Sequence, residues 1–243
     1  MEQMRNSLSG FGFILGLSLI VSTLIGVGVF YKIKSGENVL SVTGSAKKAV
    51  VSDQVKWSLS VSRIAKVATL KSGYEQIARD TEVVKKFLKD NGVLDTEVTI
   101  SPVYMEQNYD QQYVSQEDKS YTLRQSIDID SADVVKIEAL AKNTGSVINQ
   151  GVVMSVNSLQ FYYSKLAEER VALLADAVKD AKARAAELAN SNGQKVGSLK
   201  SASSGVVQVL SKGSTEVSDY GSYDTSKIDK DIMVTVRVSF SLR

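Results

Sequence analysis

The stretch ADAVKDAKARAAELA, residues 175–189, decides the fold of this chain. Alanine has the highest helix propensity, so the stretch predicts the middle of a long helix over about residues 165–190. Apolar side chains recur three or four residues apart along it, which is the spacing of one buried helix face. That face is expected to consist of Leu174, Val178, Ala181, Ala185 and Leu188. Its small alanines would let the helix pack closely on a sheet.

The sheet is indicated by segments in which apolar and polar residues alternate, the pattern of a strand with one buried face. The strongest is residues 232–242, and a second covers residues 55–61, where Trp57 is expected to face the core. A short strand at 40–44 precedes the polar segment 45–53. That segment predicts a turn, so the strands on either side of it are expected to pair as an antiparallel hairpin.

The rest of the chain alternates between helix-like and strand-like spacing. The predicted elements are helices over 67–90 and 131–144, and strands near 98–104, 121–129, 152–163, 195–201 and 206–210. A one-residue slip of the apolar phase predicts a β-bulge near Asn157 and Ser158. Polar loops are expected at 106–119 and 211–231. This order favours an α+β fold of mostly antiparallel sheet packed with helices.

Residues 11–31 form an apolar run without a charge. As a helix with a rise of about 1.5 Å per residue, the run spans roughly the 30 Å hydrocarbon core of a bilayer. A cleaved signal peptide has a shorter apolar stretch and a small-x-small cleavage site, for which the exit offers only Gly26 and Gly28. The sequence therefore favours a retained transmembrane anchor over a cleaved leader, with a short tail at 1–10 and a linker at 32–37.

Small residues recur along the predicted anchor. They are Gly12, Gly16, Ser18, Ser22 and Gly26. Stripes of small residues let helices approach closely in lipid, so these positions are candidate contacts between anchors. The alternative is that glycine is simply common in membrane helices.

Composition narrows the chemistry. The chain has no His and no Cys, which excludes a His general base, a Ser-His-Asp triad, a Cys nucleophile and a zinc site built from these ligands. The 29 Lys and Arg against 27 Asp and Glu give a net charge of +2 without a basic patch, so no nucleic acid is expected as a partner. We expect no catalytic residue, no cofactor and no metal, and a protein that is not an enzyme.

Four carboxylates are possible ligands. Asp53 precedes a strand, where Asp more often bonds backbone N–H groups of a turn than it binds a ligand or carries a proton. Asp128 and Asp130 lie on the polar face of a strand with Asp133 nearby, and such a cluster could hold calcium. No EF-hand spacing accompanies them, so a solvated strand face and a helix cap are the preferred interpretation.

Four tyrosines lie in the polar segments: Tyr109, Tyr113, Tyr220 and Tyr223. Tyrosine is enriched at protein interfaces because it offers contact area at a small cost in side-chain entropy. These residues are candidate oligomer or partner contacts, and the alternative is that they belong to solvated loops.

Three features in order resemble proteins of the SIMPL-domain family. They are Val42–Ala46 followed by Asp53, the helix at 175–189 followed by Gly193 and Gly197, and the closing strand Val234–Phe240. The resemblance covers about residues 38–243 and implies an α+β fold outside the bacterial inner membrane. It further implies ring-like or channel-like homo-oligomers, as in the similar periplasmic immunogenic proteins, and a link to oxidative-stress defence. It carries over no catalytic residue.

The expected protein is therefore a SIMPL-like domain at 38–243 held to the bilayer by residues 11–31. Its expected partners are copies of itself and lipid, and the alternative is an accessory subunit that binds another membrane or envelope protein. The resemblance implies a single-pass protein of the inner membrane with its domain in the periplasm or outside the cell. A strict count of the charges that flank the anchor, Arg5 against Lys32 and Lys34, would instead place the domain in the cytoplasm.

Overall fold

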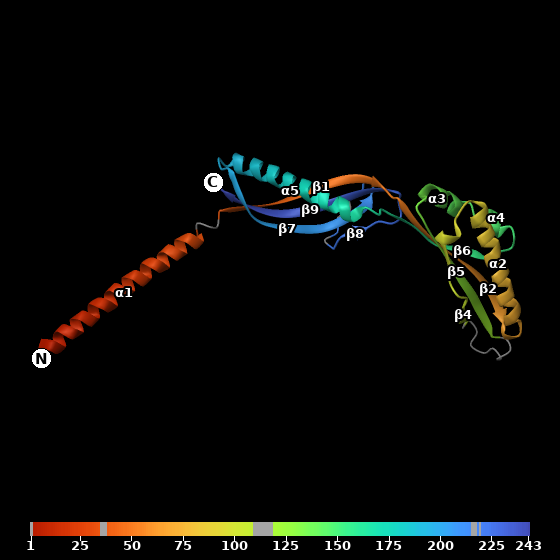
Figure 1. The fold of residues 1–243 in the computed structure, drawn as a ribbon, viewed down its shortest axis with the longest axis horizontal. Helices are drawn as coiled ribbons and strands as arrows, with labels where there is room; N and C mark the ends of the chain where they lie inside the picture. Colours follow the sequence, from red (N-terminus) through yellow and green to blue (C-terminus); the bar gives the residue numbers. More distant parts are fainter. Residues whose placement is uncertain (1, 35–37, 109–118, 215–217, 219) are drawn as a thin grey trace. The chain divides into compact units, whose positions relative to one another are not determined.

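The computed structural model describes residues 2–34, 38–108, 119–214, 218 and 220–243, which form a mixed α+β structure (Figure 1). The helices are α1 (Glu2–Lys34), α2 (Leu70–Asp90), α3 (Val134–Lys142), α4 (Gly145–Ile148) and α5 (Leu166–Ser191), with 3-10 turns at Val67–Thr69 and Asp95–Glu97. The strands are β1 (Val39–Val51), β2 (Gln54–Lys66), β3 (Val98–Ile100), β4 (Tyr104–Gln107), β5 (Ser120–Ser131), β6 (Met154–Tyr162), β7 (Val196–Ser211), β8 (Ser222–Tyr223) and β9 (Asp229–Leu242).

The strands form two sheets. One has the order β1-β9-β7-β8, and the other has the order β3-β5-β2-β6 with β4 also paired to β5. The chain divides into two compact units. Unit 1 contains residues 1–45, 174–205 and 235–243, and unit 2 contains residues 46–173 and 206–234. The predicted α+β class and the mostly antiparallel pairing are confirmed.

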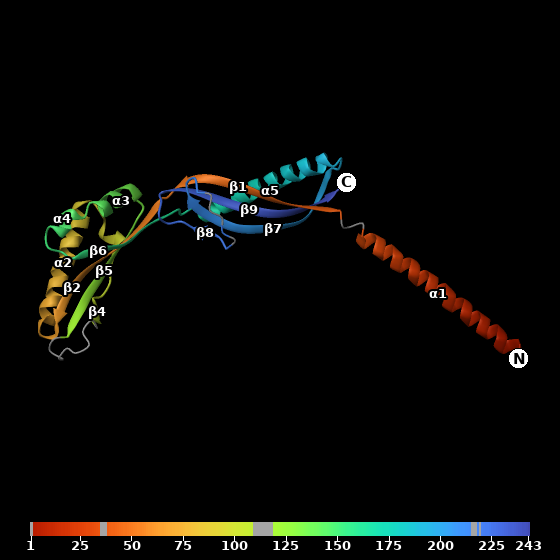
Figure 2. The ribbon, with the colours of Figure 1, turned by 180° about the vertical axis from the view of Figure 1, so that it is seen from behind.

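In unit 1, α5 lies along the sheet (Figures 1 and 2). Its buried face consists of Ala177, Ala181, Ala185 and Ala189, none more than 2% exposed. The predicted stripe was partly wrong, because Leu188 is 52% exposed and Leu174 and Val178 are only half-buried. The helix is rotated toward its smallest side chains, because these allow its backbone to come closest to the strands.

Gly44 of β1 shows how close that approach is. A Cβ atom at this position would overlap the carbonyl oxygen of Ala177 and would lie 2.5 Å from the backbone nitrogen of Ala181. Only glycine fits between strand and helix here. Two of the three features that carried the family resemblance, the segment around Gly44 and the alanine-rich helix, are therefore the two sides of one contact.

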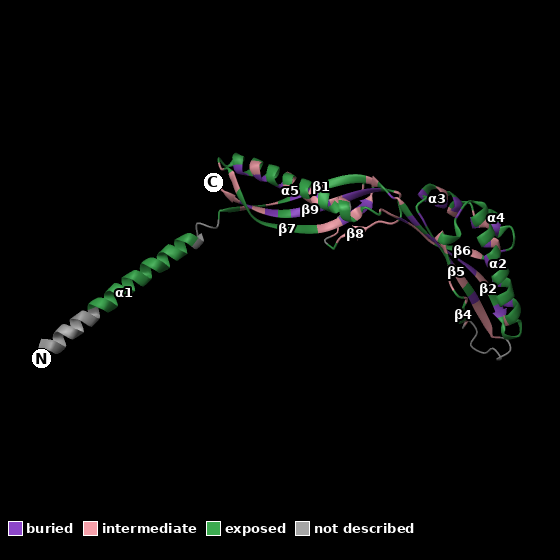
Figure 3. Ribbon diagram, viewed as in Figure 1, coloured by how far each residue is buried: buried purple, intermediate pink, exposed green. Residues whose placement is uncertain are grey.

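In unit 2, β2 is the central strand of its sheet and pairs antiparallel with β5 and β6. Helices α2 and α3 pack on this sheet, and the core between them appears in purple in Figure 3. Trp57 is 1% exposed, so its predicted core position is confirmed. The predicted bulge is confirmed as well, because Ser58 pairs with Ser158 and Leu59 with Val156, which leaves Asn157 as the extra residue.

The predicted hairpin was wrong. Strand β1 continues through the expected turn to Val51 and belongs to a different sheet from β2. The polar side chains that suggested a turn form ion pairs instead: Lys47 Nζ lies 2.8 Å from Asp231 Oδ2, and Lys48 Nζ lies 2.6 Å from Glu169 Oε2. These lysines therefore pair with acidic residues distant in the chain and do not indicate a solvated turn.

Four further boundaries differ from prediction. The two short strands expected at 195–201 and 206–210 are one strand, β7. The polar segment 211–231 contains β8 and the start of β9, and the polar segment expected from residue 106 begins inside β4. Helix α1 begins at Glu2, so the expected N-terminal tail is helical from that residue on.

Candidate functional site

The anchor helix is the first candidate functional element. Within α1, Phe13–Lys32 is long and apolar enough to cross a membrane, and no other helix in the described parts of the chain meets this test. All of these side chains are exposed in the monomer (Figure 3). The finding is consistent with a membrane anchor, and an N-terminal signal sequence would pass the same test.

The predicted contact stripe on α1 is accessible where it is described. An added Cβ at Gly16 or Gly26 would meet no atom within 4 Å. The hydroxyls of Ser18 and Ser22 donate to the carbonyls of Leu15 and Leu19, so neither serine carries an unsatisfied donor into lipid. The surroundings of Gly12 are outside what the structure describes. The stripe stays a prediction.

Tyr223 and Tyr220 have different surroundings. Tyr220 is 97% exposed. Tyr223 is half-buried: its hydroxyl accepts the N–H of Tyr163 at 2.8 Å, and its ring centroid lies 5.7 Å from that of Tyr162. Burial raises the pKa of Tyr223. Tyr223 therefore holds its own unit together, Tyr220 is exposed and its role as a contact stays a prediction, and Tyr109 and Tyr113 lie outside the described residues.

Lys230 is a fully buried lysine that the sequence pattern did not single out. Its ammonium group donates to the carbonyl oxygen of Asp224 and lies 5.6 Å from the centroid of the Tyr223 ring. Burial lowers the pKa of Lys230. Lys230 lies just before the alternating apolar segment that begins at Ile232, so its place in the sequence is typical of a solvated strand end. The contacts show that it holds the segment 222–230 in place.

Asp53 reaches a distant segment rather than a local turn. Its carboxylate accepts the N–H of Ser164 at 2.8 Å and the hydroxyl of Ser164 at 2.6 Å, just before α5 begins. Burial alone would raise the pKa of Asp53, but these two hydrogen bonds, the backbone N–H of Asp53 itself and the positive charge of Lys165 together lower the pKa. The residue thus orients the entry into the long helix.

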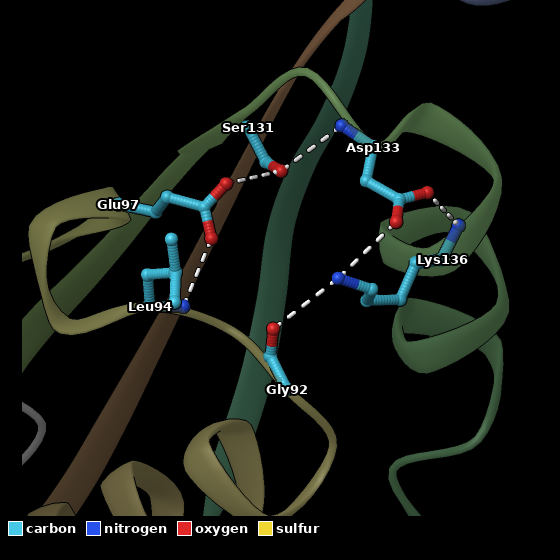
Figure 4. A network of polar contacts seen from close by, with 6 residues as sticks. All are labelled: Gly92, Leu94, Glu97, Ser131, Asp133 and Lys136. Carbon is cyan, nitrogen blue, oxygen red and sulfur yellow. Dashed lines mark hydrogen bonds and ion pairs between the residues drawn. The ribbon is translucent and has the colours of Figure 1, made fainter.

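The three carboxylates of the possible calcium site lie in different surroundings. Asp133 caps α3 by accepting the N–H of Lys136 at 3.1 Å, as predicted (Figure 4). Asp130 lies 3.3 Å from Lys56 across the strand pair, and Asp128 is exposed. Among the described residues, no group of three or more Asp or Glu is placed to hold a metal ion.

Figure 4 shows a polar network that locks the end of β5. Glu97 accepts the hydroxyl of Ser131 at 2.6 Å and the N–H of Leu94 at 2.9 Å. Ser131 in turn accepts the N–H of Asp133 at 3.1 Å, and Lys136 Nζ donates to the carbonyl of Gly92 at 3.2 Å. Because these groups satisfy one another, the network is structural.

An open groove of about 710 Å³ lies within unit 2. Its lining combines apolar side chains, lysines and acids, and includes Leu159, Phe161, Ile228, Lys142, Lys212 and Lys227. Lys142 already forms an ion pair with Glu138 at 2.7 Å. The groove has the volume of a ligand site.

Asp231 gives unit 2 a testable dependence on pH. The hydrogen bond from Lys47 and the N–H of Gly213 at 2.9 Å lower the pKa of Asp231. A carboxyl with a lowered folded pKa stabilises the protein above its unfolded pKa of about 3.9, and this contribution is lost as the pH falls through the folded value. We expect Asp231→Asn to lower the free energy of unfolding at pH 7 and to lower it progressively less as the pH falls below about 4, measured by urea denaturation. Asp128→Asn, at an exposed site, is the control; an equal loss in both variants would contradict the assignment.

The chain matches one protein-family model over most of its length. A family model described as "SIMPL: Protein of unknown function (DUF541)" matches residues 40–241. No curated protein matches the chain. The match covers β1 through β9, so both sides of the Gly44 contact lie within it.

Proposed function

Since this chain belongs to the SIMPL family, whose function is unknown, we propose that it is a membrane-anchored scaffold without catalytic activity. Copies of it assemble into a ring or cage at the outer face of the bacterial inner membrane, with a role in envelope or oxidative-stress defence. The single observation that carries the proposal is the apolar stretch Phe13–Lys32 of α1, whose residues are all exposed and which is long enough to cross a membrane.

The anchor would promote assembly without any specific contact of its own. Proteins confined to a membrane meet at a raised effective concentration, so weak contacts between their domains are multiplied. The open positions at Gly16 and Gly26 add a surface on which helices could approach closely in lipid. Scaffolding also fits the polar clusters, because Asp53, Asp133 and Lys230 are all committed to holding the fold.

Membrane retention tests the anchor. An arginine at the centre of a membrane helix costs about 2.5–3.5 kcal/mol on insertion scales. We expect the double variant Ile20→Arg, Leu24→Arg to lose most of its membrane fraction after carbonate washing, measured by quantitative immunoblotting. The volume-matched variant Ile20→Leu, Leu24→Ile should remain in the membrane. Release of the wild-type chain by the same wash would refute anchoring.

The oligomer and its orientation have separate readouts. Light scattering of the detergent-extracted full-length chain should give a mass of several copies, and a clean monomer would refute the scaffold proposal.

Because the chain has no cysteine, Tyr220→Cys introduces a single thiol at the most exposed of the described tyrosines. A membrane-impermeant maleimide should label it in spheroplasts without lysis if the domain faces outward, and only after lysis if it faces the cytoplasm.

The alternative is an accessory subunit that holds another membrane or envelope protein. The groove lined by Leu159, Phe161 and Ile228, together with the exposed Tyr220, is the observation that favours it. A pull-down with the anchor intact distinguishes the two proposals, because a foreign protein in stoichiometric amount would favour the accessory role.

A further inference from the structure

Three strands of unit 1 meet at the end of the sheet that follows the anchor in the chain. The carbonyl of Asn38, just before β1, accepts the N–H of Leu242 at 2.9 Å. Lys195, just before β7, and Arg243, just after β9, exchange both backbone hydrogen bonds, at 2.8 and 2.9 Å. The start of β1, the start of β7 and the end of β9 therefore share one end of the sheet (Figures 1 and 2).

The length of the chain keeps this end close to the anchor. Helix α1 ends at Lys34, and Asn38 follows four residues later. An extended chain spans at most about 3.3–3.6 Å per residue, so Asn38 lies within about 14 Å of the end of α1 whatever path the chain takes. The headgroup layer itself is about 5–8 Å thick on each side of the hydrocarbon core. With Phe13–Lys32 across the bilayer, this end of the sheet is held next to the headgroups.

Lys195 and Arg243 form a pair of like charges at this end. Residues that exchange both hydrogen bonds lie directly opposite each other, so their side chains share a face with Cβ atoms about 4.5–5.5 Å apart. Both side chains are exposed, and within the described part of the chain neither forms an ion pair. Like charges directly opposite each other destabilise a sheet. The pair is therefore repulsive until an anion lies against it.

The surrounding charge is also mainly positive. Helix α1 ends with Lys32 and Lys34, and β1, β7 and β9 carry no acidic residue within unit 1. The nearest acids in the sequence are Glu37, in the connecting segment, and Glu187 on α5. Positive charge thus exceeds negative charge at the end of the sheet that the chain holds beside the membrane.

We propose that this end of unit 1 docks on anionic lipid headgroups, whose phosphates lie against Lys195 and Arg243. Each Lys or Arg near an anionic membrane surface strengthens binding about fivefold, and the attraction fades within a Debye length of about 8 Å at physiological ionic strength. Lipid is the occupant because the anchor keeps headgroups beside these charges at all times. The inference rests on the proposed membrane anchoring and adds a second contact between the domain and the bilayer.

A fluorescent label beside the charge pair measures docking. The chain has no cysteine, so Asn192→Cys places a single thiol at an exposed position between α5 and β7. The labelled full-length chain is reconstituted into vesicles of phosphatidylcholine, with or without phosphatidylglycerol, that contain a lipid with a quenching spin label on its headgroup. Quenching gives the ratio of docked to undocked domains. This ratio should be at least tenfold higher with phosphatidylglycerol, and the difference should disappear at about 1 M salt, where the Debye length is about 3 Å.

Two double variants with the same change in charge separate this end from the rest of the sheet. Lys195→Gln, Arg243→Gln should lower the docked ratio in phosphatidylglycerol vesicles at least tenfold, since two charges together supply about 25-fold. Lys200→Gln, Arg237→Gln removes the same residue types about 16 and 20 Å farther along β7 and β9, beyond a Debye length, and should change the ratio less than twofold. In a circular-dichroism melt, Lys195→Gln, Arg243→Gln should melt no lower than the wild type, because it removes a repulsion.

The outcomes separate this proposal from membrane anchoring. Equal docking in the two kinds of vesicle, or equal losses in the two double variants, would overturn the lipid contact. Anchoring would still stand in that case if the wild-type chain resists the carbonate wash. If the wash releases the wild-type chain, both proposals fall.

Discussion

Gly44→Val will destabilise unit 1 by about 3 kcal/mol or more, the upper part of the range for overpacked cores. The new side chain would overlap the carbonyl of Ala177 and crowd the nitrogen of Ala181. Both are backbone atoms of a helix whose neighbouring turns are buried, so neither can move without tilting α5 away from the sheet. The measurement is the free energy of unfolding by urea denaturation, followed by circular dichroism.

The control for this variant is Gly145→Ala. An added Cβ at Gly145 meets no atom within 4 Å, and the residue lies in helix α4. Its substitution should cost less than about 0.5 kcal/mol, as for surface changes in general. The second-site change Ala181→Gly should recover only part of the loss from Gly44→Val, because the overlap with the Ala177 carbonyl remains. Equal stabilities of Gly44→Val and Gly145→Ala would refute the close contact.

Asp80→Ala is the second change with a large expected effect. Arg63 on β2 forms a bidentate pair with Asp80 on α2, with Nε–Oδ2 and Nη2–Oδ1 distances of 2.6 and 2.9 Å. The two side chains are only 20% and 8% exposed. Removing the carboxylate leaves a largely buried guanidinium without its counter-charge, which costs about 3–5 kcal/mol for buried pairs. Urea denaturation of unit 2 should show a loss in this range.

The same helix supplies the matched control. Lys86 and Asp90 form an ion pair of 2.7 Å with side chains that are 75% and 56% exposed. Asp90→Ala should cost less than about 1 kcal/mol, because water and salt screen an exposed pair. The double variant Arg63→Ala, Asp80→Ala should be more stable than Asp80→Ala alone, since no unpaired charge remains. Similar losses of unfolding free energy from Asp80→Ala and Asp90→Ala would show that the buried pair stabilises the protein no more than the exposed pair does.

Sequence pattern predicted the parts of this fold that depend on local physics. The spacing along α2, the alternation along β2 and the phase slip at Asn157 each follow from which side chains must be buried. The apolar run ending near Tyr31 likewise matches the helix that is long enough to cross a membrane. None of these required knowledge of a partner distant in the chain.

The predictions failed where contacts with residues distant in the chain determine the local structure. Lys47 and Lys48 look like a polar turn until Asp231 and Glu169, far along the chain, are known to face them. Ala181 and Ala185 of the predicted α5 face are buried, but Leu188 is exposed and Ala177 and Ala189 are buried instead, because Gly44 lets the helix approach most closely on its alanine side. Lys230 gave no signal, since nothing local reveals that the carbonyl of Asp224 and the ring of Tyr223 will enclose it.

The pairing of β1 with β9 also sets an order of events during synthesis. Ser41 and Ser239, whose hydroxyls lie 2.8 Å apart, are separated by 198 positions. Chains are made from the N-terminus at about 5–20 residues per second, so β1 emerges first and waits roughly ten seconds or more for its partner. Strands β2, β5 and β6 can meet earlier because all of them precede residue 163. Strand β9 therefore completes the sheet begun by the first strand only after β2, β5 and β6 have been made, and a chain truncated before β9 would leave β1 exposed as an aggregation-prone edge.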